Sequence, residues 1–167
     1  MIYLPTNLDE PLDQGDVIGG CPIASVATFD PAADDSAVTK VTLQRIVVLT
    51  QTCDLAQQKT LYVNVAVAFD AQYLVDEKLI KPADIKGQLR SGRIWGLYFL
   101  PADADLGLPE MIVDFRRIHT IKLELLRTLC RAGKRLGRVR PLYREHLAKH
   151  FADTFSRIGL PRPYETL

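Results

Sequence analysis

Apolar and polar residues follow one another over the first 121 residues in short runs that predict β-strands. Residues 38–44 alternate in the manner of a half-buried strand, whereas 45–50 contain Ile-Val-Val-Leu, a continuous run typical of a strand covered on both faces. Residues 93–100, with three aromatic and three aliphatic side chains, form the clearest strand. The other predicted strands are 15–18, 21–29, 61–69, 111–115 and 118–121. This spacing favours a barrel or sandwich over a βαβ sheet.

The last quarter of the chain changes to a helical period. From Pro141, apolar residues recur in steps of three and four until Gly159 and Pro161, which predicts an amphipathic helix over 141–158. We expect this helix to pack through Leu147, Phe151 and Phe155. Short helical segments are also predicted at 51–59, 71–77 and 82–90, the last beginning at Pro82.

Length and composition indicate a single globular domain. The chain has 167 residues, 47% hydrophobic and 25% charged, which excludes disordered, collagen-like and coiled-coil classes. We expect a barrel over about 15–122, followed by a basic connection and the helix over about 123–161. No apolar run reaches membrane-spanning length, so no membrane partner is expected. Three widely spaced cysteines argue against a disulfide framework and predict a reducing, cytoplasmic location.

Charge is divided unevenly along the chain. Residues 1–115 hold 8 Lys and Arg against 16 Asp and Glu, a net charge of −8. Residues 116–162 hold 13 against 3, a net charge of +10. Such an asymmetry indicates either an anionic partner or a basic tail that folds against the acidic front part. The sequence leaves both explanations open.

The Gln-Thr-Cys-Asp step at 51–54 follows a strand of the buried type, where sheets often present reactive groups. Cys53 is a candidate nucleophile, with His119 or His146 as its base and Asp54 orienting that histidine or binding a metal. The alternative is structural. Cys53 would then be a small buried apolar residue and Asp54 would cap the next turn.

His146 and His150 are four residues apart on the predicted C-terminal helix and therefore share a face, as zinc-binding pairs do. A third ligand would come from Cys53, Asp54 or Glu145. Because Glu145 precedes His146, the pattern is not HExxH, and we expect no metal site, with this pair as the alternative. No cofactor is expected, since the chain contains no Walker A, GxGxxG, GxSxG or CxxC motif.

Residues 131–140 contain five basic residues and two glycines. This composition suits phosphate binding, because Arg and Lys release counterions from a nucleic-acid backbone and Gly permits close approach. The predicted nucleic-acid-binding residues are Arg131, Lys134, Arg135, Arg138, Arg140 and Arg144. The alternative is a solvated loop or hairpin. Trp95, Tyr98 and Phe99 would stack bases if exposed, although an aromatic strand more often belongs to a core.

The order of several motifs resembles the MazF/PemK toxin family, small barrels that are commonly RNA endonucleases. The matching segments are Gly-Asp-Val-Ile at 15–18, the Arg-led strand 45–50, the apolar strand 63–69, Arg-Ile-His-Thr-Ile at 117–121 and Arg-Leu-Gly-Arg at 135–138. The resemblance implies an SH3-like barrel with short helical insertions and a C-terminal helix. It also implies RNA as substrate, a homodimer, and an antitoxin-like protein partner. The tail and the 51–54 step are similar to uncharacterised bacterial proteins.

Family residues carry over at Arg45 and Thr50, whereas the strand 38–44 replaces the family's acidic, Gly-rich loop. We therefore expect a nucleic-acid-binding protein resembling a toxin-type endoribonuclease, either divergent or inactive. Arg45, Thr50, Cys53, Asp54 and His119 would line its cleft. Cleavage would be metal-independent attack by the RNA 2′-hydroxyl, with His119 as general acid or base and Arg45 stabilising the phosphorane.

Two other functions are open to this sequence. The first is a non-catalytic module that docks a partner protein, and the second is a Cys53-dependent hydrolase. Salt dependence separates the first from nucleic-acid binding, because only phosphate contacts weaken steeply as ionic strength rises.

Overall fold

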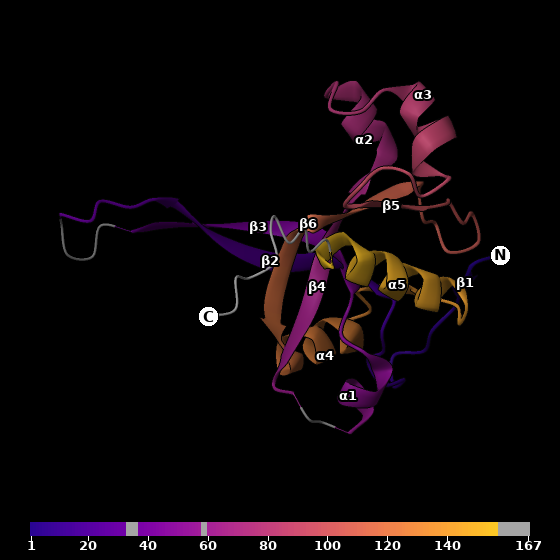
Figure 1. Ribbon diagram of the computed structural model, residues 1–167. Helices are drawn as coiled ribbons and strands as arrows, with labels where there is room; N and C mark the ends of the chain where they lie inside the picture. The colour runs from indigo at the N-terminus through magenta and orange to yellow at the C-terminus, as the bar shows by residue number, and fades with distance from the viewer. Residues whose placement is uncertain (33–36, 58–59, 157–167) are drawn as a thin grey trace, which may run out of the picture.

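The computed structural model describes residues 1–32, 37–57 and 60–156. Within these ranges seven strands form one antiparallel sheet in the order β1-β7-β2-β3-β4-β6-β5 (Figure 1). The strands are β1 (Tyr3–Leu4), β2 (Asp16–Thr28), β3 (Val38–Val48), β4 (Tyr62–Asp70), β5 (Leu97–Leu100), β6 (Met111–Lys122) and β7 (Arg135–Val139). The helices are α1 (Thr52–Ala56), α2 (Ala71–Asp76), α3 (Pro82–Asp84) with its π-helical continuation η1 (Ile85–Leu89), α4 (Leu123–Arg131) and α5 (Tyr143–Phe155). The predicted mainly β fold with short helices and a C-terminal helix is confirmed.

The sheet is open, so the predicted closed SH3-like barrel is wrong. In the described ranges β1 and β5 stand at opposite ends of the strand order, and no hydrogen-bonded ladder joins them. The two edges contact each other through side chains, since Tyr3 on β1 and Leu100 on β5 share a core and Tyr3 Oη donates to the Pro101 carbonyl at 3.0 Å. β1 has two residues and β5 has four, too few for a closing ladder. The result is a curled sheet rather than a barrel.

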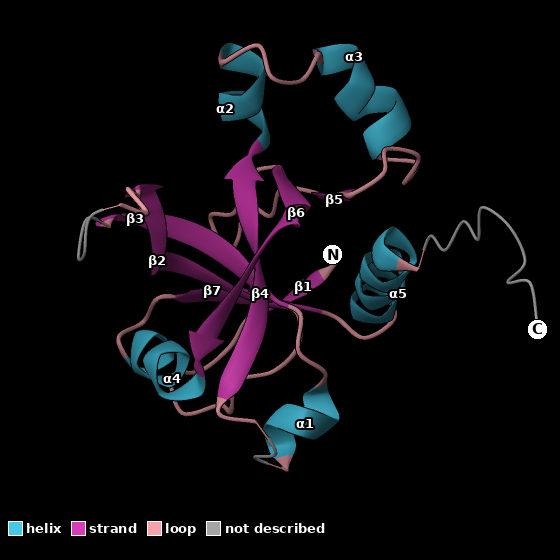
Figure 2. Cartoon of the chain, turned by 60° about the vertical axis from the view of Figure 1, so that its left-hand side comes forward, coloured by secondary structure: helices cyan, strands magenta, loops and turns pink. Residues whose placement is uncertain are grey.

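Each face of the sheet carries its own apolar core, because successive side chains of a strand point to opposite faces. Val47 and Phe115 belong to the core that α5 covers with Leu147. Val48 belongs to the core on the other face, which α4 covers with Leu126. Figure 2 shows α4 and α5 on opposite sides of the sheet. A third, smaller core lies beneath α2 and η1.

Several predicted strands are joined into longer ones. Predicted strands 15–18 and 21–29 are both part of β2, which crosses Gly19 and Gly20 by a bulge, with Gly20 at a positive φ of 67°. β6 is likewise one strand where two were predicted. The α4 helix and β7 form within the segment that the sequence predicted to be a basic connection. The sheet therefore draws its strands from both sides of the predicted barrel limits of 15 and 122.

The C-terminal helix is confirmed as α5. Leu147 is fully buried and Phe151 packs against the same core, whereas Phe155 is exposed. The predicted end of the helix, at 157–161, lies outside the described residues. Within the described part of the chain, no helix has the length and apolar character needed to cross a membrane.

β2 and β3 extend beyond the sheet as a two-stranded ribbon, here called the arm and comprising residues 22–29 and 38–44. Figure 1 shows the arm projecting sideways from the sheet. β2 pairs with β7 only from Asp16 to Ile18, and β3 pairs with β4 only from Ile46 to Val48. In the described structure, both outer edges of the arm therefore lack a neighbouring strand.

Candidate functional site

The predicted phosphate-binding segment forms β7, which turns two of its arginines toward carboxylates of the same chain. The Arg135 guanidinium is 2% exposed and lies 3.1 Å from the fully buried carboxylate of Asp16. Arg138 Nε lies 2.6 Å from the same carboxylate. Burial opposes the charge of Arg138, but hydrogen bonding and charge from Asp16, with Asp13 and Glu10 beyond, raise its pKa. These arginines have internal partners, which accounts for part of the charge asymmetry.

The other four predicted phosphate-binding residues divide into two pairs. Arg144 on α5 lies 2.7 Å from the Asp13 carboxylate, and Arg140 Nε donates to the Tyr3 carbonyl at 3.0 Å. Arg131, the last residue of α4, and Lys134, in the turn before β7, are both exposed, and Arg131 lies 3.9 Å from Glu124. The structure therefore leaves two of the six residues open to a phosphate backbone.

Cys53 lies on α1 and is exposed, so the alternative of a buried structural thiol is wrong. Its Sγ lies 3.6 Å from Gln51 Oε1 and 3.8 Å from Asp54 Oδ1. Among the described residues, no histidine has a recorded contact with it. Asp54 lies in the first turn of α1 and provides no side-chain cap. The thiol is accessible, and its hydrogen-bond partners in the described part of the chain, Gln51 and Asp54, carry no positive charge that would favour the thiolate.

Arg45 and His119, the two groups expected to act on one phosphate, belong to opposite faces of the sheet. Arg45 shares the face of Val47, whose core also contains Tyr3. Burial raises the pKa of Tyr3, and the charge of Arg45 acts in the opposite direction. His119 pairs with Val65, whose side chain belongs to the other core. Burial and then the charge of Arg117 lower the pKa of His119. The predicted catalytic pair therefore does not converge.

Thr50 uses its hydroxyl in a strand junction. Its hydroxyl accepts a hydrogen bond from the Asn64 backbone N–H at 2.8 Å, and this bond ties the end of β3 to β4. A side chain that completes a strand junction in this way has a structural function. The expected cleft therefore has its candidate residues distributed over α1 and both faces of the sheet.

His146 and His150 pack α5 against the sheet. His146 Nδ1 lies 2.9 Å from Tyr98 Oη, and the His150 ring contacts Tyr98 and Phe115 at centroid distances of 5.5 and 5.8 Å. Burial, followed by the nearby His146, lowers the pKa of His150. Within the described ranges, no three metal-ligating side chains gather at one point.

The predicted base-stacking aromatics have different positions. Tyr98 is buried, and burial raises its pKa to about 12, as expected of a core residue. Phe99 is half-buried beneath the Arg90 guanidinium, at 5.0 Å. Trp95 is 46% exposed, and its indole N–H donates to the Thr154 carbonyl of α5 at 3.1 Å.

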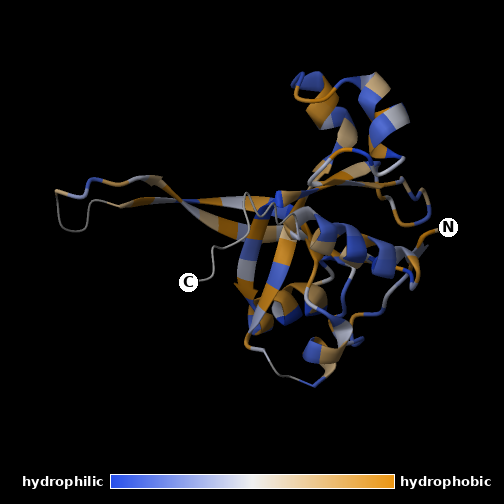
Figure 3. Ribbon diagram, viewed as in Figure 1, coloured by the Kyte–Doolittle hydropathy of each residue, from blue (hydrophilic) through white to orange (hydrophobic). Residues whose placement is uncertain are grey.

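The feature that the sequence did not reveal is an apolar face on the arm. Residues paired across two strands share a face, and the pairs Pro22–Leu43, Ala24–Val41 and Val26–Thr39 place apolar groups on one side of the ribbon. Figure 3 shows apolar residues interspersed with polar ones along the arm. The sequence pattern predicted the strands of the arm correctly, at 21–29 and, by its alternation, at 38–44. It did not indicate that no layer of this chain's described residues covers them.

Comparisons with known proteins add no assignment. No family model matches the chain, and no curated protein sequence matches it. Any functional argument therefore depends on the geometry of the arm and on the contacts given above.

Proposed function

We propose that this protein is a protein-interaction module that docks another protein chain along the arm. The observation that carries the proposal is the exposure of large apolar side chains on a ribbon that projects from the sheet. Three of them, Val26, Val41 and Leu43, share the apolar face of the arm and are between 59% and 72% exposed. Val38 is exposed on the opposite face, and Phe29 is exposed just beyond the end of β2. Several exposed apolar side chains on one face mark an interaction site, whereas single exposed apolar residues are ordinary.

The arm also lacks the stability that a third strand would give it. A two-stranded hairpin alone in water is marginally stable, and three or more strands with a covered apolar face are needed for independence. Natural proteins protect open edges with charges, prolines or short strands. The arm has Lys40 as its one charged residue and Pro22 as its one proline. A partner that covers the apolar face, or pairs with an open edge, supplies what the arm lacks.

The size of the arm limits how a partner can bind. Eight residues at ~3.3 Å each, in two strands ~4.8 Å apart, give a face of roughly 260 Å². Specific interfaces bury about 800 Å² on each partner. One face of the arm is therefore too small, and the partner must surround the arm or also contact the body of the protein.

RNA binding, which the family resemblance implies, is the second proposal and has less support. Two exposed cations, at the end of α4 and in the turn before β7, favour it, while Arg135, Arg138 and Arg144 have carboxylate partners. Tight binding to a nucleic-acid backbone takes several phosphate contacts and falls steeply with salt. A shallow salt dependence of binding to single-stranded RNA would remove this proposal.

Site-specific photo-crosslinking tests the interaction proposal in the producing cell. The crosslinking residue p-benzoylphenylalanine replaces Val41 on the arm, and Ala104, an exposed residue in the β5–β6 loop, serves as the control position. We expect irradiation to attach one identifiable protein at position 41 and none at 104, and the purified pair to bind again on mixing. No adduct at position 41, or the same adducts at both positions, would overturn the proposal.

A further inference from the structure

A second uncovered apolar surface lies between α2 and the β5–β6 end of the sheet. It is a groove of about 460 Å³ lined mainly by apolar side chains, among them Phe69, Ile94 and Ile112. Leu79 and Tyr73 also line it and are 67% and 52% exposed. Its volume lies within the range of ligand-binding sites. Ile112 is fully buried, whereas Leu79 and Tyr73 leave apolar surface open to solvent.

The rim of the groove carries a cation that is open to a carboxylate. Arg116 is paired with Asp114 through two bonds of 2.8 and 2.9 Å. Arg117 stacks over the Phe69 ring at 5.2 Å, and no ion pair links it to a carboxylate within the described ranges. Asp84 also lines the groove. A ligand with an apolar side chain beside a carboxylate would match Phe69 and Arg117 together.

The end of the arm offers the apolar part of such a ligand. Phe29 is 66% exposed, whereas the carboxylate of the next residue, Asp30, accepts the Ala32 backbone N–H at 2.9 Å. Phe29 is therefore the side chain of the arm that matches the apolar lining of the groove.

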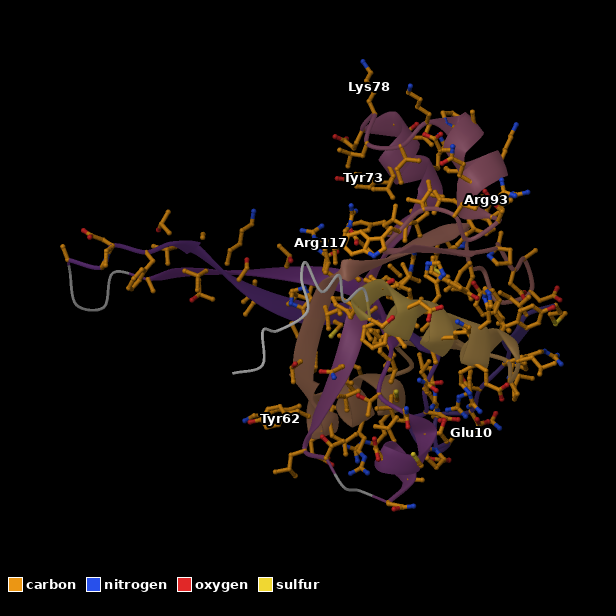
Figure 4. The ribbon with its side chains drawn as sticks, in the orientation of Figure 1. Glu10, Tyr62, Tyr73, Lys78, Arg93 and Arg117 are labelled. Carbon is orange, nitrogen blue, oxygen red and sulfur yellow. The ribbon has the colours of Figure 1, made fainter. Side chains whose placement is uncertain are left out.

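The arm and the groove also occupy neighbouring positions in the fold. Figure 4 places Arg117 where the arm leaves the sheet and Tyr73 above it on α2, both on the side toward which the arm projects. The arm and the α2–α3 insertion therefore bound a corner. Two chains related by a twofold axis perpendicular to the arm would lay their arms antiparallel, each in the corner of the other.

We propose that the partner of the arm is a second copy of this chain, and that the arms exchange so that Phe29 of each chain enters the groove of the other. This inference rests on the proposed function and names its partner. In the exchanged dimer, each chain buries the face of its own arm and the surface that receives the partner's arm. At the same strand spacing, these two surfaces together amount to roughly 520 Å² per chain. Contact between the antiparallel arms then brings the interface near the ~800 Å² that stable association needs.

The dimer is tested by sedimentation and light scattering of the purified full chain over a range of concentrations. Phe29→Asp on the arm and Leu79→Asp in the groove each place a charge in the proposed contact. We expect each to raise the dimer dissociation constant at least about tenfold. Leu61→Asp is the matched control, since Leu61 is 79% exposed and belongs to neither surface. Urea unfolding of each variant verifies that it folds.

A disulfide tests the pairing of arm and groove directly. In a Cys53→Ser background, a chain with Phe29→Cys is mixed with a chain carrying Tyr73→Cys under mild oxidation. The heterodimeric disulfide is expected, and a Phe29→Cys chain mixed with Leu61→Cys is expected to form none. The two remaining native cysteines are buried and do not compete.

The outcomes separate this inference from the proposed function. A dimer that is unaffected by Leu79→Asp and forms no disulfide between positions 29 and 73 would overturn the seating of the arm in the groove. A chain that stays monomeric while position 41 crosslinks to a different protein would overturn the homodimer and leave the interaction proposal standing. A monomer with no adduct at position 41 would overturn both.

Discussion

Replacing Asp16 with Asn tests whether the ion pairs at the beginning of β2 hold the fold together. The Asp16 carboxylate is fully buried and accepts hydrogen bonds from Arg135 at 3.1 Å and from Arg138 at 2.6 and 3.1 Å. It also accepts the Asp13 backbone N–H at 3.0 Å. Asparagine has nearly the same shape but no charge, so the substitution leaves the Arg135 guanidinium buried beside a neutral amide.

The expected loss of stability follows from the buried arginine charge that the substitution leaves without its counterion. Breaking a buried ion pair by removing one partner costs ~3–5 kcal/mol, because the remaining charge has neither water nor a counterion. Arg138 keeps Glu10 and Asp13 within 3.5 and 3.9 Å, so we expect the lower end of that range, about 3 kcal/mol. Since typical domains are stable by only ~5–15 kcal/mol, this is a large fraction of the total.

Urea unfolding followed by circular dichroism measures the loss, with the slope of the transition as a check on two-state behaviour. Glu10→Gln is the control. Its side chain is partly exposed and its contact with Arg138 is long, so the cost should stay below about 1 kcal/mol. If Asp16→Asn also cost less than about 1 kcal/mol at an unchanged slope, the pairing would not stabilise the fold.

Three further predictions concern titration, thiol reactivity and RNA. Burial lowers the pKa of His150. Between that pKa and about 6.5 the unfolded chain therefore binds more protons than the folded chain, and the free energy of unfolding should fall as pH drops. His150→Leu should flatten this part of a urea-stability profile from pH 5 to 7. Iodoacetamide should alkylate Cys53 as fast as it alkylates an unstructured cysteine peptide. Cys21, whose pKa is raised by burial to about 11, and the buried Cys130 should react only on unfolding. A Cys53 rate more than about tenfold above that of the peptide would restore the hydrolase interpretation. Binding to single-stranded RNA should show a logarithmic salt slope of at most about two, lowered by about one in Lys134→Gln.

Most of the long strands were predictable from the sequence, but β7 was not, because it buries an arginine. Alternation identified the outer part of β3, and continuous apolar runs identified its inner part and β4. β7 also alternates, but Arg135, Gly137 and Val139 point inward, so a polar residue occupies a position that the pattern assigns to the surface. Its partner Asp16 is 119 residues away in sequence. The opposite charges of the two halves of the chain were the one sign of this pairing.

The predicted site was wrong because the face on which a side chain lies depends on where its strand begins and ends and on its register. Arg45 and His119 belong to segments that the sequence divided differently, and the face of each side chain follows only once β3 and β6 are single strands of known register. The α4 helix had a readable signal, since Leu123, Leu126 and Cys130 recur at steps of three and four and are all buried. The density of basic residues around it favoured the interpretation as a phosphate-binding connection.

β2 links the two unusual features of this protein. At its start, Asp16 is buried among arginines, and ten residues later Val26 is exposed on the arm. A strand that places charge inside and apolar groups outside departs from the hydrophobic pattern at both ends, and each departure needs its own compensation. The arginines supply it for Asp16 within the chain, so Asp16→Asn should act on folding. For Val26, which is 64% exposed, the proposed function assigns that role to a partner chain. Changes at Phe29 should therefore alter association and leave the urea stability of the monomer unchanged.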